Sequence, residues 1–85
     1  MKWVLLIANR ARRAKRDMPR ADAEQIDAAY VEMRKDPYSG DIKFLKGTDR
    51  AVRRRVGAWR IMFDVDDDGR IVVVTDVKRR DSNTY

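Results

Sequence analysis

The chain opens with a run of apolar side chains, Trp3–Ala8, whose first five residues favour strands. Apolar character that is continuous, without alternation, predicts a strand covered on both faces, here Trp3–Ile7. The run is shorter than the roughly 7–15 apolar residues of a signal peptide and far shorter than the ~20 of a membrane span. We therefore expect a buried strand and no membrane partner.

Two helical patterns follow. Arg10–Met18 lacks Gly and Pro, with Asn9 as its candidate N-cap and Pro19 at its end. Ala23–Lys35 is expected to be capped by Asp22, because a Gln follows three residues later at the capping-box spacing. Each helix has one apolar face, made by Ala11, Ala14 and Met18 in the first and by Ile26, Tyr30 and Met33 in the second. The short connection predicts an antiparallel helix hairpin.

The second half of the chain has the pattern of a β-meander. Ala51–Val56 and Ala58–Val65 alternate between apolar and polar side chains, which predicts strands with one buried face. Asp66–Gly69 is typical of a hairpin turn, and the β-branched run Ile71–Val77 predicts an interior strand. Lys78–Tyr85 is expected to be a polar, basic tail.

These elements predict an α+β fold within one domain, residues 1–85. We expect an N-terminal strand and an antiparallel two-helix hairpin packed on one face of a largely antiparallel four-stranded sheet. A chain of this length leaves no room for a second core.

The charge of the chain predicts an anionic partner. Lys and Arg number 20 against 14 Asp and Glu, which leaves a net charge of +6. There is no Cys and no His, so disulfides, thiol catalysis and the commonest metal ligand and general base are excluded. A cytoplasmic location fits, and we expect no cofactor. Asp64–Gly69 matches the start of a calcium loop, but Thr75 stands where such a loop needs Glu, so we favour a plain turn and expect no metal.

Strand register predicts a cluster of arginines. The apolar sides of the two alternating strands lie on one face only if the residue numbers of each opposed pair add to an odd number. A turn at Val56-Gly57 makes this sum 113 for every pair. This register brings Arg53 opposite Arg60, with Arg55 on the same face. Because like charges across a ladder cost stability, such a cluster is a candidate anion site. Two solvated, Arg-rich strand faces are the alternative interpretation.

The order of these elements and several short motifs resemble the RelE/ParE toxin superfamily. The motifs are Phe-Leu-Lys-Gly at 44–47, the arginine-rich run from Arg53 to Phe63, the valines at 72–74 and Lys-Arg-Arg-Asp at 78–81. The resemblance implies the toxin of a type II toxin–antitoxin pair. RelE-like members are mRNA endoribonucleases that cut message on the ribosome and arrest translation. The partners implied are the ribosome, mRNA and an acidic antitoxin.

The resemblance also implies the site residues. Arg60, Arg79 and Tyr85 match catalytic positions, whereas phosphate or RNA binding is implied for Arg53, Arg55, Lys78 and Arg80. Arginine can clamp a phosphate with two hydrogen bonds but is a poor proton acceptor, so the general base stays unassigned. Two alternatives stay open: a toxin that acts by binding, such as a ParE-like poison of DNA gyrase, and a nonspecific nucleic-acid binder.

Overall fold

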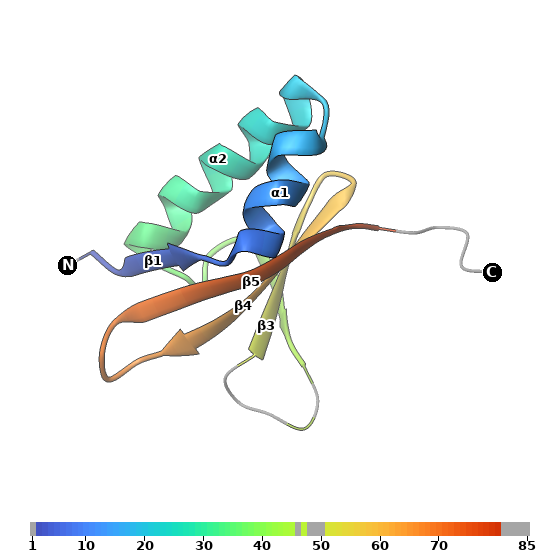
Figure 1. Cartoon of the computed structure of the whole chain (residues 1–85). Helices are drawn as coiled ribbons and strands as arrows, with labels where there is room; N and C mark the ends of the chain where they lie inside the picture. The colour runs from blue at the N-terminus through green and yellow to red at the C-terminus, as the bar shows by residue number, and fades with distance from the viewer. Residues whose placement is uncertain (1, 46, 48–50, 81–85) are drawn as a thin grey trace.

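The computed structural model describes residues 2–45, 47 and 51–80. Two helices lie on one face of a single five-stranded sheet with the strand order β1-β5-β4-β3-β2 (Figure 1). The elements are β1 (Val4–Ile7), α1 (Asn9–Asp17), α2 (Arg20–Lys35), β2 (Asp41–Phe44), β3 (Ala51–Val56), β4 (Trp59–Asp66) and β5 (Ile71–Arg79). The predicted α+β architecture is confirmed, and the expected count of four strands is one too low.

The fifth strand is β2, which lies at one edge of the sheet. It pairs antiparallel with β3, and Asp41 is the partner of Arg55. Its sequence gave no strand signal, because it holds only four residues and alternation over so short a stretch is hard to recognise. The addition of β2 makes β3 an interior strand, so the face that carries arginines is wider than predicted.

Strand β1 lies at the other edge, parallel to β5. Leu5 and Ile7 pack against the core, whereas Val4 and Leu6 are 53% and 51% exposed on the opposite face. The prediction of a strand covered on both faces is therefore wrong. The helices cover one face only, and a continuous apolar run does not reveal which of its side chains stay uncovered.

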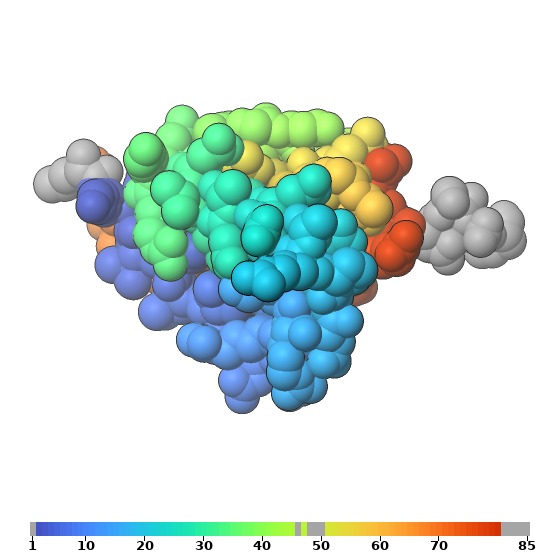
Figure 2. Space-filling view, turned by 90° about the horizontal axis from the view of Figure 1, so that it is seen from above, coloured from blue at the N-terminus to red at the C-terminus, as the bar shows by residue number. Residues whose placement is uncertain are grey.

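The two helices form the predicted hairpin, and Figure 2 shows that they cover the middle of the sheet. Helix α1 begins at Asn9 itself, so Asn9 is not the cap, and no side chain caps the preceding Ala8. Helix α2 begins at Arg20, three residues before the predicted start, which leaves Asp22 inside its first turn. No helix in the described residues is both long and apolar enough to span a membrane.

The core lies between the helices and the sheet. Its largest fully buried side chains include Phe63 and Ile61 of β4 and Ile26 and Met33 of α2. The apolar face predicted for each helix is buried there, apart from Ala14, which is partly exposed. Burying a large apolar side chain stabilises the fold by roughly 1.5–3 kcal/mol, so these residues fix the sheet face that the helices cover.

A β-bulge interrupts the pairing of β4 with β5. Met62 pairs with Asp76 but the next residue, Phe63, pairs with Val74, so Thr75 is an extra residue on β5. Because side chains alternate along a strand, the extra residue exchanges the two faces for everything that follows it. Strand β5 also continues to Arg79, beyond the predicted end at Val77, so Lys78 and Arg79 belong to the sheet and not to a tail.

Candidate nucleic-acid interface

A row of charged side chains crosses the sheet face that the helices leave open. Arg55 of β3 is the partner of Arg60 of β4, and Arg60 is the partner of Lys78 of β5. At the β2 end of the row, the Asp41 carboxylate lies 3.8 Å from Arg55 Nε. We call Arg55, Arg60 and Lys78 the cation row. Three adjacent strands thus present three positive charges side by side.

The predicted register differs from this arrangement by two residues. Arg55, not Arg53, is opposite Arg60, and Arg53 pairs with Met62 one row further along. The prediction assumed a turn at Val56-Gly57. In the structure Val56 pairs with Trp59, and the two-residue turn is Gly57-Ala58, with Gly57 at the positive φ of 57° that favours glycine. The predicted sharing of one face by all three arginines is nevertheless correct.

Arg79 does not join the cation row. The bulge turns it to the helix side of the sheet, where its guanidinium lies 5.7 Å from the ring centroid of Trp59. The Trp59 indole in turn donates a hydrogen bond of 3.0 Å to Asp22. The expectation that Arg79 lies with Arg53, Arg55 and Arg60 is therefore wrong, and Lys78 takes the position beside them.

The remaining predicted residues follow β5. Arg80 is exposed, and its backbone N–H donates a hydrogen bond of 2.6 Å to the carbonyl of Ala58, which extends the pairing of β4 and β5 by one step. Tyr85 lies outside the described residues. The structure thus brings together Arg55, Arg60 and Lys78, keeps Arg53 on the same face, and separates Arg79 from them.

A carboxylate on the open face escaped the sequence analysis. Asp76 follows the bulge and is opposite Met62, and its side chain is 14% exposed. Its Oδ1 accepts the backbone N–H of Val77 at 2.8 Å, and its Oδ2 lies 3.7 Å from Arg10 of α1. Regular pairing from Val74 onward would put position 76 on the buried face of β5, and the bulge reverses this.

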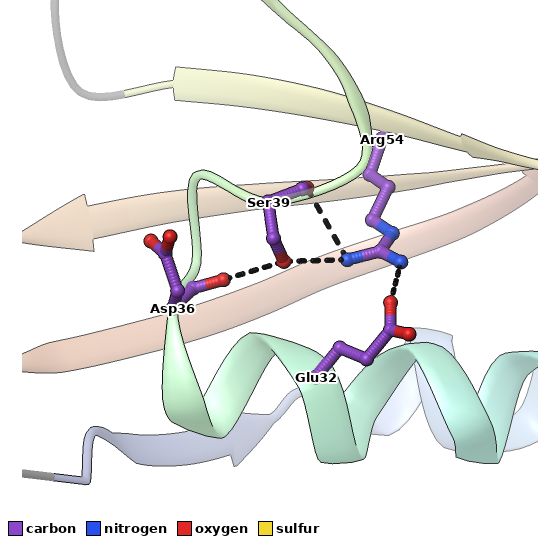
Figure 3. Close-up of polar contacts among 4 residues, drawn as sticks. All are labelled: Glu32, Asp36, Ser39 and Arg54. Carbon is purple, nitrogen blue, oxygen red and sulfur yellow. Dashed lines mark hydrogen bonds and ion pairs between the residues drawn. The ribbon is translucent and has the colours of Figure 1, made fainter.

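The middle of three consecutive arginines points the other way, into the core. The side chain of Arg54 is 8% exposed and forms an ion pair with Glu32 of α2. Its Nη1 also donates to Ser39 Oγ at 3.2 Å and to the Ser39 carbonyl at 3.3 Å, as Figure 3 shows. Ser39 is itself held by the Asp36 carbonyl at 2.8 Å. This network joins α2 to β3, so it fixes the facing of Arg53 and Arg55.

A pocket of about 230 Å³ lies on the helix side, away from the cation row. It is lined by Ile7, Ala11, Arg12, Lys15, Arg16 and Tyr30. Pockets that hold drug-sized ligands measure roughly 300–1,000 Å³, so this one is smaller than a typical cofactor site. Burial, followed by the charge of Asp27, raises the pKa of Tyr30 to about 12.

The chemistry available on the open face is that of anion binding. Each of the two guanidinium groups carries five N–H donors in a planar arrangement, and the ammonium group carries three. Both kinds of group bind phosphate oxygens well. Directly opposed like charges destabilise a sheet, and an anion between them would offset that repulsion. A row that spans three strands fits an extended polymer lying across the sheet.

Comparison with known proteins supports the predicted family. The sequence matches no protein-family model. It is 29% identical over 84 residues to a curated protein of Methanocaldococcus jannaschii named "Putative toxin RelE1", covering 95% of this chain and 93% of that protein. The fold is similar to a chain of the archaeal RelE–RelB complex from Pyrococcus horikoshii, with a TM-score of 0.83, 20% identity, and 94% and 97% of the two chains covered. The isolated E. coli RelE toxin gives a TM-score of 0.77 at 20% identity, over 93% of this chain and 85% of that one.

In sequence and in fold, the chain is similar to RelE-like toxins over nearly its whole length. The predicted resemblance to RelE-like toxins is thereby confirmed, and it extends over nearly the whole of this chain. The order of one strand, two helices and a meander, expected from the sequence, is the order that the structure has. Within this RelE-like fold the cation row lies on the three middle strands of the uncovered sheet face, next to the turn between β3 and β4.

Proposed function

We propose that this chain is the toxin of a toxin–antitoxin pair and acts as a ribosome-dependent mRNA endoribonuclease that arrests translation. The observation that carries the proposal is the cation row of Arg55, Arg60 and Lys78 on an open sheet face. The similarity to RelE-like toxins supports it, because the motif resemblance implies an mRNA endoribonuclease that cuts message on the ribosome.

The cation row would hold the phosphate that is cut. Cleavage by attack of the 2′-hydroxyl creates a crowded phosphorane with additional negative charge, and preorganised cationic donors stabilise such a species. Arg55 and Arg60 are adjacent on neighbouring strands, so both can reach one phosphate. Arg53 and Arg80 would bind neighbouring phosphates along the strand of RNA. Tyr85 would contact the base, as the resemblance implies.

An acidic antitoxin is the partner proposed for the free protein. The structures that resemble this chain include RelE–RelB toxin–antitoxin complexes from P. horikoshii and M. jannaschii. The net charge of +6 supports an acidic partner, and the half-exposed Val4 and Leu6, further along the same sheet face, offer apolar surface to it. A segment that folds as it binds could cover both surfaces.

The facing of Arg79 favours a second candidate, a toxin that acts by binding, such as a ParE-like poison of DNA gyrase. Arg79 lies over Trp59 on the helix side and would not contact a phosphate held by the cation row. A toxin that only binds has no need for that residue at the site.

The test is expression of the chain in cells followed by primer extension on translated mRNA. We expect cuts within codons of translated message, and we expect them to disappear in Arg60→Ala. Arg20→Ala is the matched control, because Arg20 is 92% exposed on the opposite side of the molecule at the start of α2. Growth arrest with intact message and accumulation of gyrase-cleaved DNA would contradict the nuclease proposal and support the second candidate.

A further inference from the structure

The bulge at Thr75 moves one carboxylate from the core side of the sheet to the open side. With regular pairing, Thr75 would be opposite Met62, and Asp76 would be opposite the fully buried Ile61. The extra residue instead brings Asp76 opposite Met62, on the face of the cation row. Bulges are common next to active sites, where they re-aim a side chain.

The surroundings of Asp76 leave one of its oxygens available. Oδ1 accepts the Val77 N–H at 2.8 Å, which fixes the orientation of the carboxylate. Oδ2 has only the more distant Arg10 Nη1 at 3.7 Å. The charged groups around Asp76 are Arg10 from α1, Arg60 and Asp64 diagonally across β4, and Lys78 two residues along β5. Three of these four groups are cationic, so the charge around Asp76 is mainly positive.

The proposed reaction requires a group that the cation row cannot supply. Arginine stays protonated at any pH in which the protein works, so Arg55 and Arg60 cannot remove a proton. The chain has neither His nor Cys. Asp41, at the edge of the same face, lies beside Arg55 and on the β2 side of the row, away from Lys78. Asp76 lies within the reach of a nucleotide whose phosphate is held between Arg60 and Lys78.

We propose that Asp76 is the proton acceptor in RNA cleavage and that Lys78 is the proton donor. This inference rests on the proposed endoribonuclease function. Asp76 Oδ2 takes the proton of the 2′-hydroxyl while that oxygen forms a bond to the adjacent phosphorus. The bond between phosphorus and the 5′-oxygen breaks, and that oxygen takes a proton from the Lys78 ammonium group. The products are a 2′,3′-cyclic phosphate and a 5′-hydroxyl, and water then returns a proton from Asp76 to Lys78.

The experiment is single-turnover cleavage of A-site mRNA on purified ribosomes, measured against toxin concentration. In Asp76→Asn the side-chain oxygen can still accept the Val77 N–H, so the bulge keeps its hydrogen bond while the base is lost. We expect the maximal rate to fall 100-fold or more, because a general base contributes about 10²–10⁴-fold. The half-saturating concentration and the urea midpoint should change little. Asp76→Glu should recover at least tenfold over Asp76→Asn.

The matched control is Asp64→Asn. Asp64 lies on the same face of β4 but pairs with Val73 and Ala51, further from the cation row, and its variant should cleave within threefold of the wild type. The inference is overturned if Asp76→Asn also cleaves within threefold, or if its loss lies wholly in binding or in folding. A wild-type chain that cuts no message overturns the proposed function as well, which distinguishes the two failures.

Discussion

Replacement of Glu32 by Gln tests the buried ion pair that holds β3 against α2. Glu32→Gln removes the charge that faces Arg54 but keeps the shape of the side chain. Arg54 is 8% exposed, so little water can reach its guanidinium, whereas Glu32 is 61% exposed. Breaking a fully buried pair costs about 3–5 kcal/mol, and a hydrogen bond to a charged group contributes about 1.5–3 kcal/mol. Because one partner is largely solvated, we expect a loss of about 1.5–2 kcal/mol.

Urea unfolding and thermal melting measure this loss. For a chain of this size the thermal midpoint should fall by roughly 6–16 °C. The matched control is Glu24→Gln on the same helix, where Glu24 lies 3.7 Å from Arg20 and both side chains are largely exposed. An exposed pair of this spacing contributes about 0.3–0.5 kcal/mol and is screened by salt, so the control should show a small effect that disappears in 1 M NaCl.

The two variants together decide the interpretation. If Glu32→Gln loses no more stability than Glu24→Gln, the pair does not hold the strand and the reasoning is refuted. A second variant, Arg54→Met in the Glu32→Gln background, removes the buried charge that the first change leaves unpaired. It should recover stability relative to Glu32→Gln alone, because apolar replacements of buried pairs are often neutral or stabilising.

Three other predictions follow from the same structure. Gly40→Ala should lower the free energy of unfolding by more than about 2 kcal/mol in urea, because its φ is +81° and an added Cβ would lie 2.7 Å from Arg54 Cζ. Gly47→Ala is the control: its φ is +85° but the space around it is open, so it should cost only the backbone strain of about 1–2 kcal/mol. The pKa of Tyr30 is raised to about 12, against 10 in the unfolded chain, so its contribution to the free energy of unfolding is complete below pH ~10 and is lost as the pH rises through ~12. The difference in stability between wild type and Tyr30→Phe should therefore change by about 2 kcal/mol across that window, and a constant difference would contradict this. Arg55→Ala should lower the maximal cleavage rate about 10²–10³-fold in the ribosome assay, and an unchanged rate would remove Arg55 from the site.

Much of the fold could be predicted from the sequence because its signals are periodic. The alternation in β4 assigned Phe63 and Ile61 to the core, and the spacing in α2 did the same for Tyr30 and Met33. The alternation in β3 likewise predicted that Arg53 and Arg55 share a face. These assignments depend on side-chain period alone, which tertiary contacts rarely reverse.

The parts that sequence reasoning missed depend on single residues whose effects are not periodic. The choice of Gly57-Ala58 for the turn moves the register by two residues, so Arg55 is the partner of Arg60. The bulge at Thr75 exchanges the roles of Lys78 and Arg79. Neither feature leaves a local sequence signal that separates it from regular pairing. The buried position of Arg54 follows from alternation, but its acceptor, Glu32, lies 22 residues away and is found only in the structure.

Because Thr75 is left unpaired, the end of β5 faces opposite to regular alternation, so the chemical identity of the open face depends on this bulge as much as on residue type. Deletion of Thr75 would give a continuous ladder that keeps Asp76 opposite Met62 and Lys78 opposite Arg60, whereas regular pairing of Thr75 with Met62 would turn Asp76 and Lys78 toward the helices. In comparisons between relatives of this chain, an alignment gap at this point would therefore leave the same groups on the open face, whereas an equally long relative with regular pairing would present the exchanged set.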